Sequence, residues 1–120
     1  MGRLAIQVTV MVSEEIRHKI MVLLENRPEM SQRELAQELN ISLGKANYCI
    51  RALIRQGAVK AANFKNSKNR KAYMYVLTPL GIEQKASLAV KFLKIKMQEY
   101  DLLRREIEEL RREADRHRAN

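Results

Sequence analysis

Residues 31–57 of this 120-residue chain read SQRELAQELNISLGKANYCIRALIRQG, and this stretch decides the fold. Ser31, with Glu34 three residues later, forms a capping box that predicts the start of a short helix. Asn40 is suited to end that helix, and Ser42 is suited to cap the next one. Two such helices joined by a turn of about three or four residues form a helix-turn-helix pattern.

The second helix of the pattern should run from Leu43 to about Gln56 and stop at Gly57. Its apolar residues at helical spacing should pack on the core, and these are Ala46, Ile50, Leu53 and Ile54. Its polar side chains then remain available for phosphates and base edges. The candidate DNA contacts at and on this helix are Ser42, Lys45, Asn47, Tyr48 and Arg51. Tyr48 has a second interpretation, in which it packs on the hairpin that follows.

An amphipathic helix precedes the pattern. Apolar residues at helical spacing predict a helix over residues 14–26, which ends before Pro28 because the residue before a proline resists the helical conformation. Residues 1–13 would form an N-terminal extension. At the start of the next helix, Gln32 and Arg33 are candidates to meet a DNA phosphate, whereas Ser31 serves chiefly as the structural cap.

The periodicity changes after Gly57. Residues 59–64 and 72–78 are short runs rich in Val, Phe and Tyr, which predict two strands of a hairpin. Asn and Ser between them favour a turn. This hairpin tip also carries four further candidate DNA contacts, Lys65, Lys68, Arg70 and Lys71. A basic hairpin after a helix-turn-helix is a winged-helix plan, although the tip could also be a merely solvated turn.

The positive charge is concentrated in this same region. Lys and Arg total 23 against 14 Asp and Glu, a formal net charge of +9. No acidic residue occurs between Glu38 and Glu83, while eight cations do: Lys45, Arg51, Arg55, Lys60, Lys65, Lys68, Arg70 and Lys71. Such a field of one sign favours a polyanionic partner, because each neutralised phosphate also releases condensed counterions. A basic face kept only for solubility is the alternative, but solubility would accept mixed signs.

Several other classes of protein are excluded or disfavoured. The single cysteine, Cys49, rules out an intramolecular disulfide framework and a Cys-paired zinc site, and it is expected to act as a small core hydrophobe. A redox sensor at Cys49 is the alternative. No apolar run could span a bilayer, and Glu14 and Glu15 stand where a leader would need small residues. No catalytic set, metal spacing or phosphate loop is visible, so we expect a cytoplasmic, non-enzymatic protein without a cofactor.

One long helix should complete the chain. Thr78-Pro79 is a cap followed by proline at the first helical position, and nothing interrupts the helix before about Arg118. Apolar residues recur there at alternating steps of three and four, which is a coiled-coil heptad pattern with Lys96 as its polar member. The expected dimerisation seam has five large members, Leu93, Tyr100, Leu103, Ile107 and Leu110.

The charges beside this seam predict its direction. With Leu93 at heptad position a, Glu99 and Glu106 lie at g, and Arg104 and Arg111 lie at e. In a parallel pair each of these glutamates faces an arginine of the partner, whereas an antiparallel pair sets like charges together. We therefore expect a parallel two-stranded coil. The alternative is an amphipathic helix that folds back on its own domain.

Four stretches of the chain also match a known pattern: SQRELA (31–36), ISLGKANY (41–48), LIRQG (53–57) and LTPLG (77–81). Together they resemble the winged-helix domain of the multiple antibiotic resistance regulator (MarR) family, above all its small branch associated with exopolysaccharide production. The resemblance implies a homodimeric transcription factor that binds pseudo-palindromic duplex DNA through its third helix and its wing. It covers about two thirds of the chain.

The chain departs from that family at both ends. Only residues 1–13 precede the first predicted helix, so the usual dimer cradle, where the family binds small molecules, should be incomplete. The coil then substitutes as the dimer device, and the expected organisation is an extension (1–13), a winged-helix domain (14–82) and a dimerisation helix (83–118). The fold class is mainly α with a small β-hairpin (α+β). A protein-interaction adaptor is the alternative function, and RNA binding is disfavoured because the chain has few aromatic residues to stack on bases.

Overall fold

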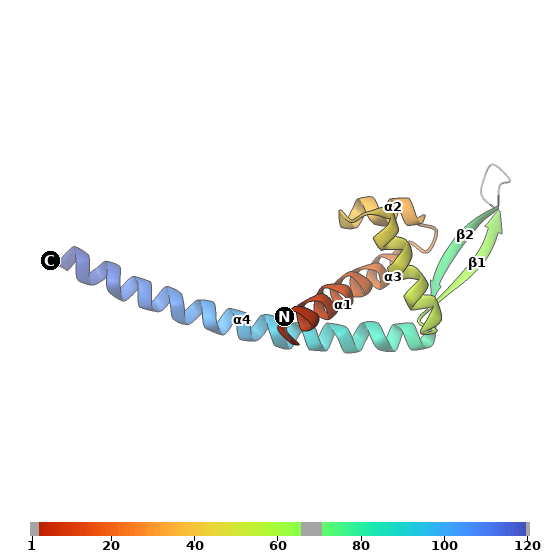
Figure 1. The fold of residues 1–120 in the computed structure, drawn as a ribbon. Helices are drawn as coiled ribbons and strands as arrows, with labels where there is room; N and C mark the ends of the chain where they lie inside the picture. The colour runs from red at the N-terminus through yellow and green to blue at the C-terminus, as the bar shows by residue number, and fades with distance from the viewer. Residues whose placement is uncertain (1–2, 66–70, 120) are drawn as a thin grey trace. The chain divides into compact units, whose positions relative to one another are not determined.

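The computed structural model describes residues 3–65 and 71–119. Within these ranges the elements follow in the order α1 (Arg3–Asn26), α2 (Gln32–Leu39), α3 (Leu43–Arg55), β1 (Val59–Lys65), β2 (Lys71–Leu77) and α4 (Pro79–Ala119) (Figure 1). The prediction of a mainly helical chain with one hairpin and a long last helix is confirmed. The chain divides into two compact units, Met1–Leu88 and Ala89–Asn120.

Helix α1 starts earlier than its apolar spacing predicts. It begins at Arg3 instead of Glu14, because neither glycine nor proline interrupts the sequence from Arg3 onward. Its end is as expected: Arg27 N–H donates to the Leu23 carbonyl at 2.7 Å, and the Asn26 side chain donates to the Val22 carbonyl at 3.1 Å. The region predicted to be an N-terminal extension is therefore helical from Arg3.

The core lies where α1, α2, α3 and the hairpin meet. Its largest fully buried side chains are Ile20, Met21, Leu24, Leu35, Ile50, Leu53 and Cys49. One predicted core residue is placed wrongly: Ile54 remains 38% exposed. The buried side of α3 includes Ala46, Cys49 and Leu53. The side that faces the core is therefore centred nearer to Cys49 than the apolar spacing predicts, and Ile54 lies outside it. The expectation that Cys49 behaves as a small core hydrophobe is thereby confirmed.

The predicted caps are present at the start of α2, at its end and at the start of α3. Ser31 Oγ accepts from Glu34 N–H at 3.1 Å, and Ser42 Oγ accepts from Lys45 N–H at 3.0 Å. Asn40 takes the left-handed conformation, with φ of 54°, and ends α2. The Glu34 carboxylate accepts a 3.3 Å hydrogen bond from the Ser31 hydroxyl. These local contacts fix where α2 begins and ends and where α3 begins.

Strands β1 and β2 pair antiparallel, from Val59 opposite Leu77 to Lys65 opposite Lys71. In Figure 1 the hairpin extends from the C-terminal end of α3. Tyr75 anchors it, because its N–H donates to the Pro28 carbonyl at 3.0 Å and only 7% of the residue is exposed. The hairpin is thus seated on the connection between α1 and α2.

Residues 57–58 contact residues 78–81 at the first turn of α4. Gly57 has φ of +76°, which favours glycine, and its carbonyl accepts a hydrogen bond from the Thr78 hydroxyl. Thr78 Oγ in turn accepts from Gly81 N–H at 3.1 Å, as expected for a helix cap. A Cβ at position 81 would lie 2.0 Å from the Ala58 carbonyl oxygen. The glycine of the Leu-Thr-Pro-x-Gly sequence therefore permits a close approach of α4 to the backbone just before β1.

Candidate nucleic-acid interface

One side of α3 is exposed along its whole length. It consists of Gly44, Lys45, Tyr48, Arg51 and Arg55, which we call the α3 face. Residues three, four and seven apart share one side of a helix, so these five residues, four of which carry side chains, form one strip. Tyr48 lies in the middle of the strip and is 64% exposed. Of its two predicted roles, the structure is consistent with the one in which it is available to a ligand.

The positive charge of this strip is not neutralised by any ion pair among the described residues. Lys45, Arg51 and Arg55 form no ion pair with any residue that the structure describes. The acidic residues that do form ion pairs lie elsewhere, with Glu38 on Arg27 at 3.4 Å and Glu25 on Lys85. The α3 face therefore presents three cations and a phenol, a set suited to phosphates and base edges.

Two predicted contact residues from different helices are brought together. Asn47 Nδ2 donates to Gln32 Oε1 at 2.9 Å, and Gln32 Nε2 donates to the Tyr75 hydroxyl at 3.1 Å. Asn47 and Gln32 are each half-buried beside the α3 face. Tyr75 was missed by the sequence reasoning, because no local pattern links residues 43 positions apart. Only the folded hairpin brings its hydroxyl to α2.

The remaining predicted contacts at the helix starts differ in their availability. Arg33 is exposed in the first turn of α2. Ser42 is exposed, but its Oγ already accepts the Lys45 N–H as the cap of α3. The hydroxyl proton of Ser42 is the part left for a phosphate oxygen, which limits its role to that of a donor.

The predicted wing contacts lie at the end of the hairpin. Lys65 is the last residue of β1 and Lys71 the first of β2, and the two are opposite each other in the register. Lys68 and Arg70 lie outside the described residues. On β1, Lys60 is exposed and carries the same sign of charge. The hairpin thus continues the acid-free stretch of chain that begins on α3.

The chemistry around Cys49 opposes a sensor role. Burial raises the pKa of the Cys49 thiol above its ordinary value, and this outweighs the opposite influence of Arg17 and Lys45. Reactive thiols have a lowered pKa and access to solvent. Cys49 has neither property.

The described ranges hold no group of three His, Cys, Asp or Glu side chains arranged to take a metal ion. None of the helices within those ranges combines the length and the apolar character needed to cross a membrane.

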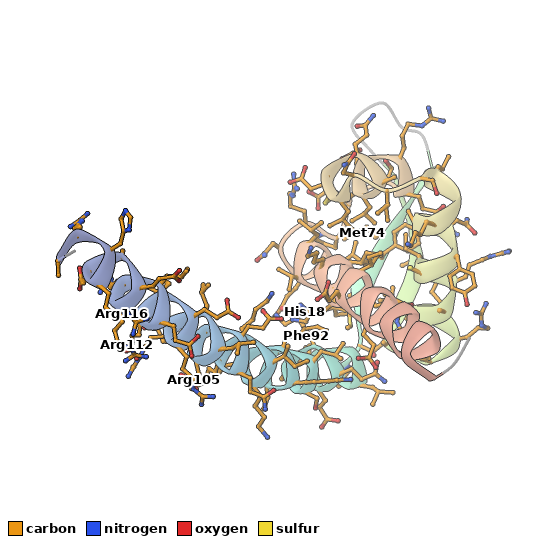
Figure 2. The ribbon with its side chains drawn as sticks, turned by 60° about the vertical axis from the view of Figure 1, so that its left-hand side comes forward. His18, Met74, Phe92, Arg105, Arg112 and Arg116 are labelled. Carbon is orange, nitrogen blue, oxygen red and sulfur yellow. The ribbon has the colours of Figure 1, made fainter. Side chains whose placement is uncertain are left out.

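The second unit is the remainder of α4 and exposes an apolar row. Its exposed members include the predicted seam residues Leu93, Tyr100, Leu103, Ile107 and Leu110. A shallow groove follows this row, lined by Tyr100, Leu103, Arg104, Ile107, Glu108 and Arg111. Arg105 and Arg112, which occupy equivalent heptad positions, project from the same side of α4 (Figure 2). The unit is thus amphipathic, with an apolar row that the rest of this unit leaves exposed.

Comparison with known proteins agrees with this architecture. A family model described as winged helix-turn-helix DNA-binding matches residues 13–60. Comparison with curated protein sequences gives no significant match.

Among solved structures, a PadR-like transcriptional regulator from Bacillus cereus strain ATCC 14579 is 18% identical, with a TM-score of 0.66 over 72% of this chain and 89% of that one. A transcriptional regulator homologue from Pyrococcus horikoshii OT3 is 22% identical, with a TM-score of 0.54 over 68% and 79%. The zinc-dependent MarR family regulator AdcR matches at 21% identity over 82% and 83%, but its TM-score of 0.47 is too low to place this chain in that family. The first two likenesses show a shared fold, in agreement with the winged helix-turn-helix family model.

Proposed function

We propose that this protein is a cytoplasmic transcriptional regulator that binds duplex DNA as a homodimer. Helix α3 enters the major groove, and the hairpin lies along the flanking backbone. The observation that carries the proposal is the α3 face, which presents Lys45, Arg51 and Arg55 without an acidic partner among the described residues. The family model that matches residues 13–60 supports the same ligand, since it describes DNA-binding domains.

The homodimer forms through a parallel coiled coil of α4. Glutamates at position g and arginines at position e would pair between two parallel copies, Glu99 with Arg104 and Glu106 with Arg111. The groove on α4 supports this arrangement, because Tyr100, Leu103, Arg104 and Ile107 occupy consecutive a, d, e and a positions. Such a set of four is the hole that receives a side chain from the facing helix of a coil.

Dimer symmetry determines the kind of operator. Two copies related by a two-fold axis bind a pseudo-palindromic site whose half-sites lie about one helical turn, roughly 34 Å, or a multiple of it apart. The resemblance to the exopolysaccharide-associated branch of the MarR family points to genes of exopolysaccharide production as candidates for regulation.

Fluorescence anisotropy with random duplex DNA at two salt concentrations tests DNA binding. A regulator of this kind should bind more weakly at higher salt, with a slope of about −0.9 for each neutralised phosphate. Selection of bound sequences from a random pool should then return a two-fold symmetric site. Binding that is absent at both salt concentrations would reject the proposal and favour a protein-interaction adaptor.

Disulfide cross-linking tests the parallel coil. A Leu110→Cys variant should give a covalent dimer on mild oxidation, because a d position faces its own copy across a parallel seam. Cys49 is buried and should not cross-link in the folded protein. An exclusively monomeric product from Leu110→Cys would exclude the parallel seam.

A further inference from the structure

Asn47, Gln32 and Tyr75 form a chain of hydrogen bonds that crosses three elements. Asn47 of α3 donates through Nδ2 to Oε1 of Gln32 on α2, at 2.9 Å. Gln32 donates through Nε2 to the hydroxyl of Tyr75 on β2, at 3.1 Å. We call these three side chains the amide relay. Each amide has distinct donor and acceptor atoms, so the orientations of Asn47 and Gln32 are coupled, whereas the Tyr75 hydroxyl can donate or accept and fixes the position of Gln32.

The hydrogen bond to Gln32 determines which atoms Asn47 offers to a ligand. A side-chain amide has an acceptor oxygen and a nitrogen that carries two hydrogens. One Nδ2 hydrogen of Asn47 is used by Gln32, so the other hydrogen and Oδ1 have no partner among the residues that the structure describes. If Gln32 turned over alone, its Nε2 would face the Nδ2 of Asn47, and two donors would meet. The amide of Asn47 is thus held in one orientation for as long as Gln32 is.

Tyr75 is the group that holds Gln32. Its hydroxyl accepts the Gln32 Nε2 hydrogen bond, and its ring belongs to the buried core. Its N–H donates to the Pro28 carbonyl at 3.0 Å, which ties the same residue to the connection before α2. Tyr75 is 7% exposed, so it influences a ligand through Gln32.

We propose that Asn47 reads an adenine in the major groove, and that Gln32 and Tyr75 are positioning residues that orient its amide. This inference rests on the proposed binding of duplex DNA by α3. An amide that presents one donor beside one acceptor matches the N7 acceptor and N6 donor of adenine. Gln32 is thereby assigned to orientation instead of direct contact, and Tyr75 acquires a role in specificity.

Single-base-pair substitution of the selected operator tests the relay. Anisotropy would compare the wild type with Asn47→Ala, Gln32→Ala and Tyr75→Phe on duplexes that differ at one base pair. Asn47→Ala should lose roughly tenfold of the preference for A·T at one position of each half-site. Tyr75→Phe and Gln32→Ala should lose part of the preference at that same position and keep it elsewhere. A purely structural defect would instead weaken binding to every duplex alike.

Gln37→Ala is the matched control, since Gln37 is an exposed glutamine of the same helix. It should retain the full adenine preference, and thermal melting should accompany every variant. Should Tyr75→Phe fail to fold, Gln32→Ala breaks the same chain from a half-buried position and decides the matter. Full adenine preference in a folded Tyr75→Phe and in Gln32→Ala would overturn the relay. A wild-type protein that binds no duplex would instead overturn the proposed function.

Discussion

At the scale of single residues, two helical glycines have opposite surroundings. A Cβ at Gly81 would lie 2.0 Å from the Ala58 carbonyl oxygen and 2.9 Å from its carbon. A Cβ at Gly44 would meet no atom within 4 Å. Both residues lie in the first turn or so of a helix, at positions where glycine costs backbone entropy. Substitution by alanine at the two positions therefore distinguishes the effect of a steric clash from the effect of helix propensity.

Gly81→Ala should lower the free energy of unfolding by about 3 kcal/mol, because the added methyl collides with backbone that cannot rotate away. Gly44→Ala should raise it by about 0.5–1 kcal/mol, because it removes entropy from the unfolded chain without a clash. Urea unfolding followed by circular dichroism measures both. Equal effects of the two substitutions would contradict the packing of α4 against Ala58.

Cys49 gives a second residue-scale prediction. Burial raises the pKa of its thiol above the ordinary value, so the folded state disfavours the thiolate. The contribution of this group to stability is complete below the ordinary thiol pKa and declines as the pH rises through the folded value. At neutral pH the native thiol should react with alkylating reagents far more slowly than in denaturant.

DNA affinity should be unchanged by peroxide, and a loss of affinity that a reductant reverses would restore the sensor interpretation.

At the scale of elements, the expected role of the α3 face changes along the helix from base contact to phosphate contact. Arg51 lies beside Asn47 in the middle of the helix, whereas Arg55 is its last residue. Base edges are read by the N-terminal part of a recognition helix, and the end of the helix is better placed for phosphates. The two arginines have the same charge and are both exposed. They are therefore a matched pair for separating base reading from backbone contact.

Arg51→Ala should relax base preference by about 1–3 kcal/mol at the position it reads. Arg55→Ala should weaken binding to all duplexes alike and lower the magnitude of the salt slope by about one. Anisotropy on the selected and the scrambled site, at several salt concentrations, measures both quantities. Unchanged sequence preference in Arg51→Ala would mean that α3 is not the reading helix.

At the scale of the whole molecule, the direction of the proposed coil would determine how the two DNA-binding domains of a dimer are presented. Glu106 at position g should face Arg111 of a second parallel copy, and each dimer would contain this pair twice. Both side chains belong to the exposed surface of the second unit. Charge reversal at one and at both positions can therefore test the pairing without altering the apolar seam.

Glu106→Arg should weaken the dimer by about 0.5 kcal/mol for each pair, because it sets arginine against arginine. Adding Arg111→Glu should restore the wild-type dissociation constant, measured by sedimentation equilibrium at low salt. A double variant that is weaker than the single one would argue against the parallel register, since both substitutions would then have removed unrelated contacts.

Local chemistry determined most of the fold from the sequence alone. Ser31, Asn40 and Ser42 act on backbone groups within a few residues of themselves, so the ends of α2 and the start of α3 could be predicted. The apolar periods of α2 and α3 and the acid-free stretch between Glu38 and Glu83 are likewise visible without a structure. The start of α1 at Arg3 was missed, because a helix without capping signals has no local marker of its first residue.

Only the tertiary structure decided which side of α3 faces the core and what its polar edge contacts. The rotation of α3 about its own axis, which buries Cys49 and exposes Ile54, depends on the shape of the space left by α1 and the hairpin. The amide relay joins Gln32 to Asn47 and Tyr75, and the Gly81 contact joins α4 to Ala58. Such pairs depend on packing between distant segments, and no short-range pattern encodes their distance.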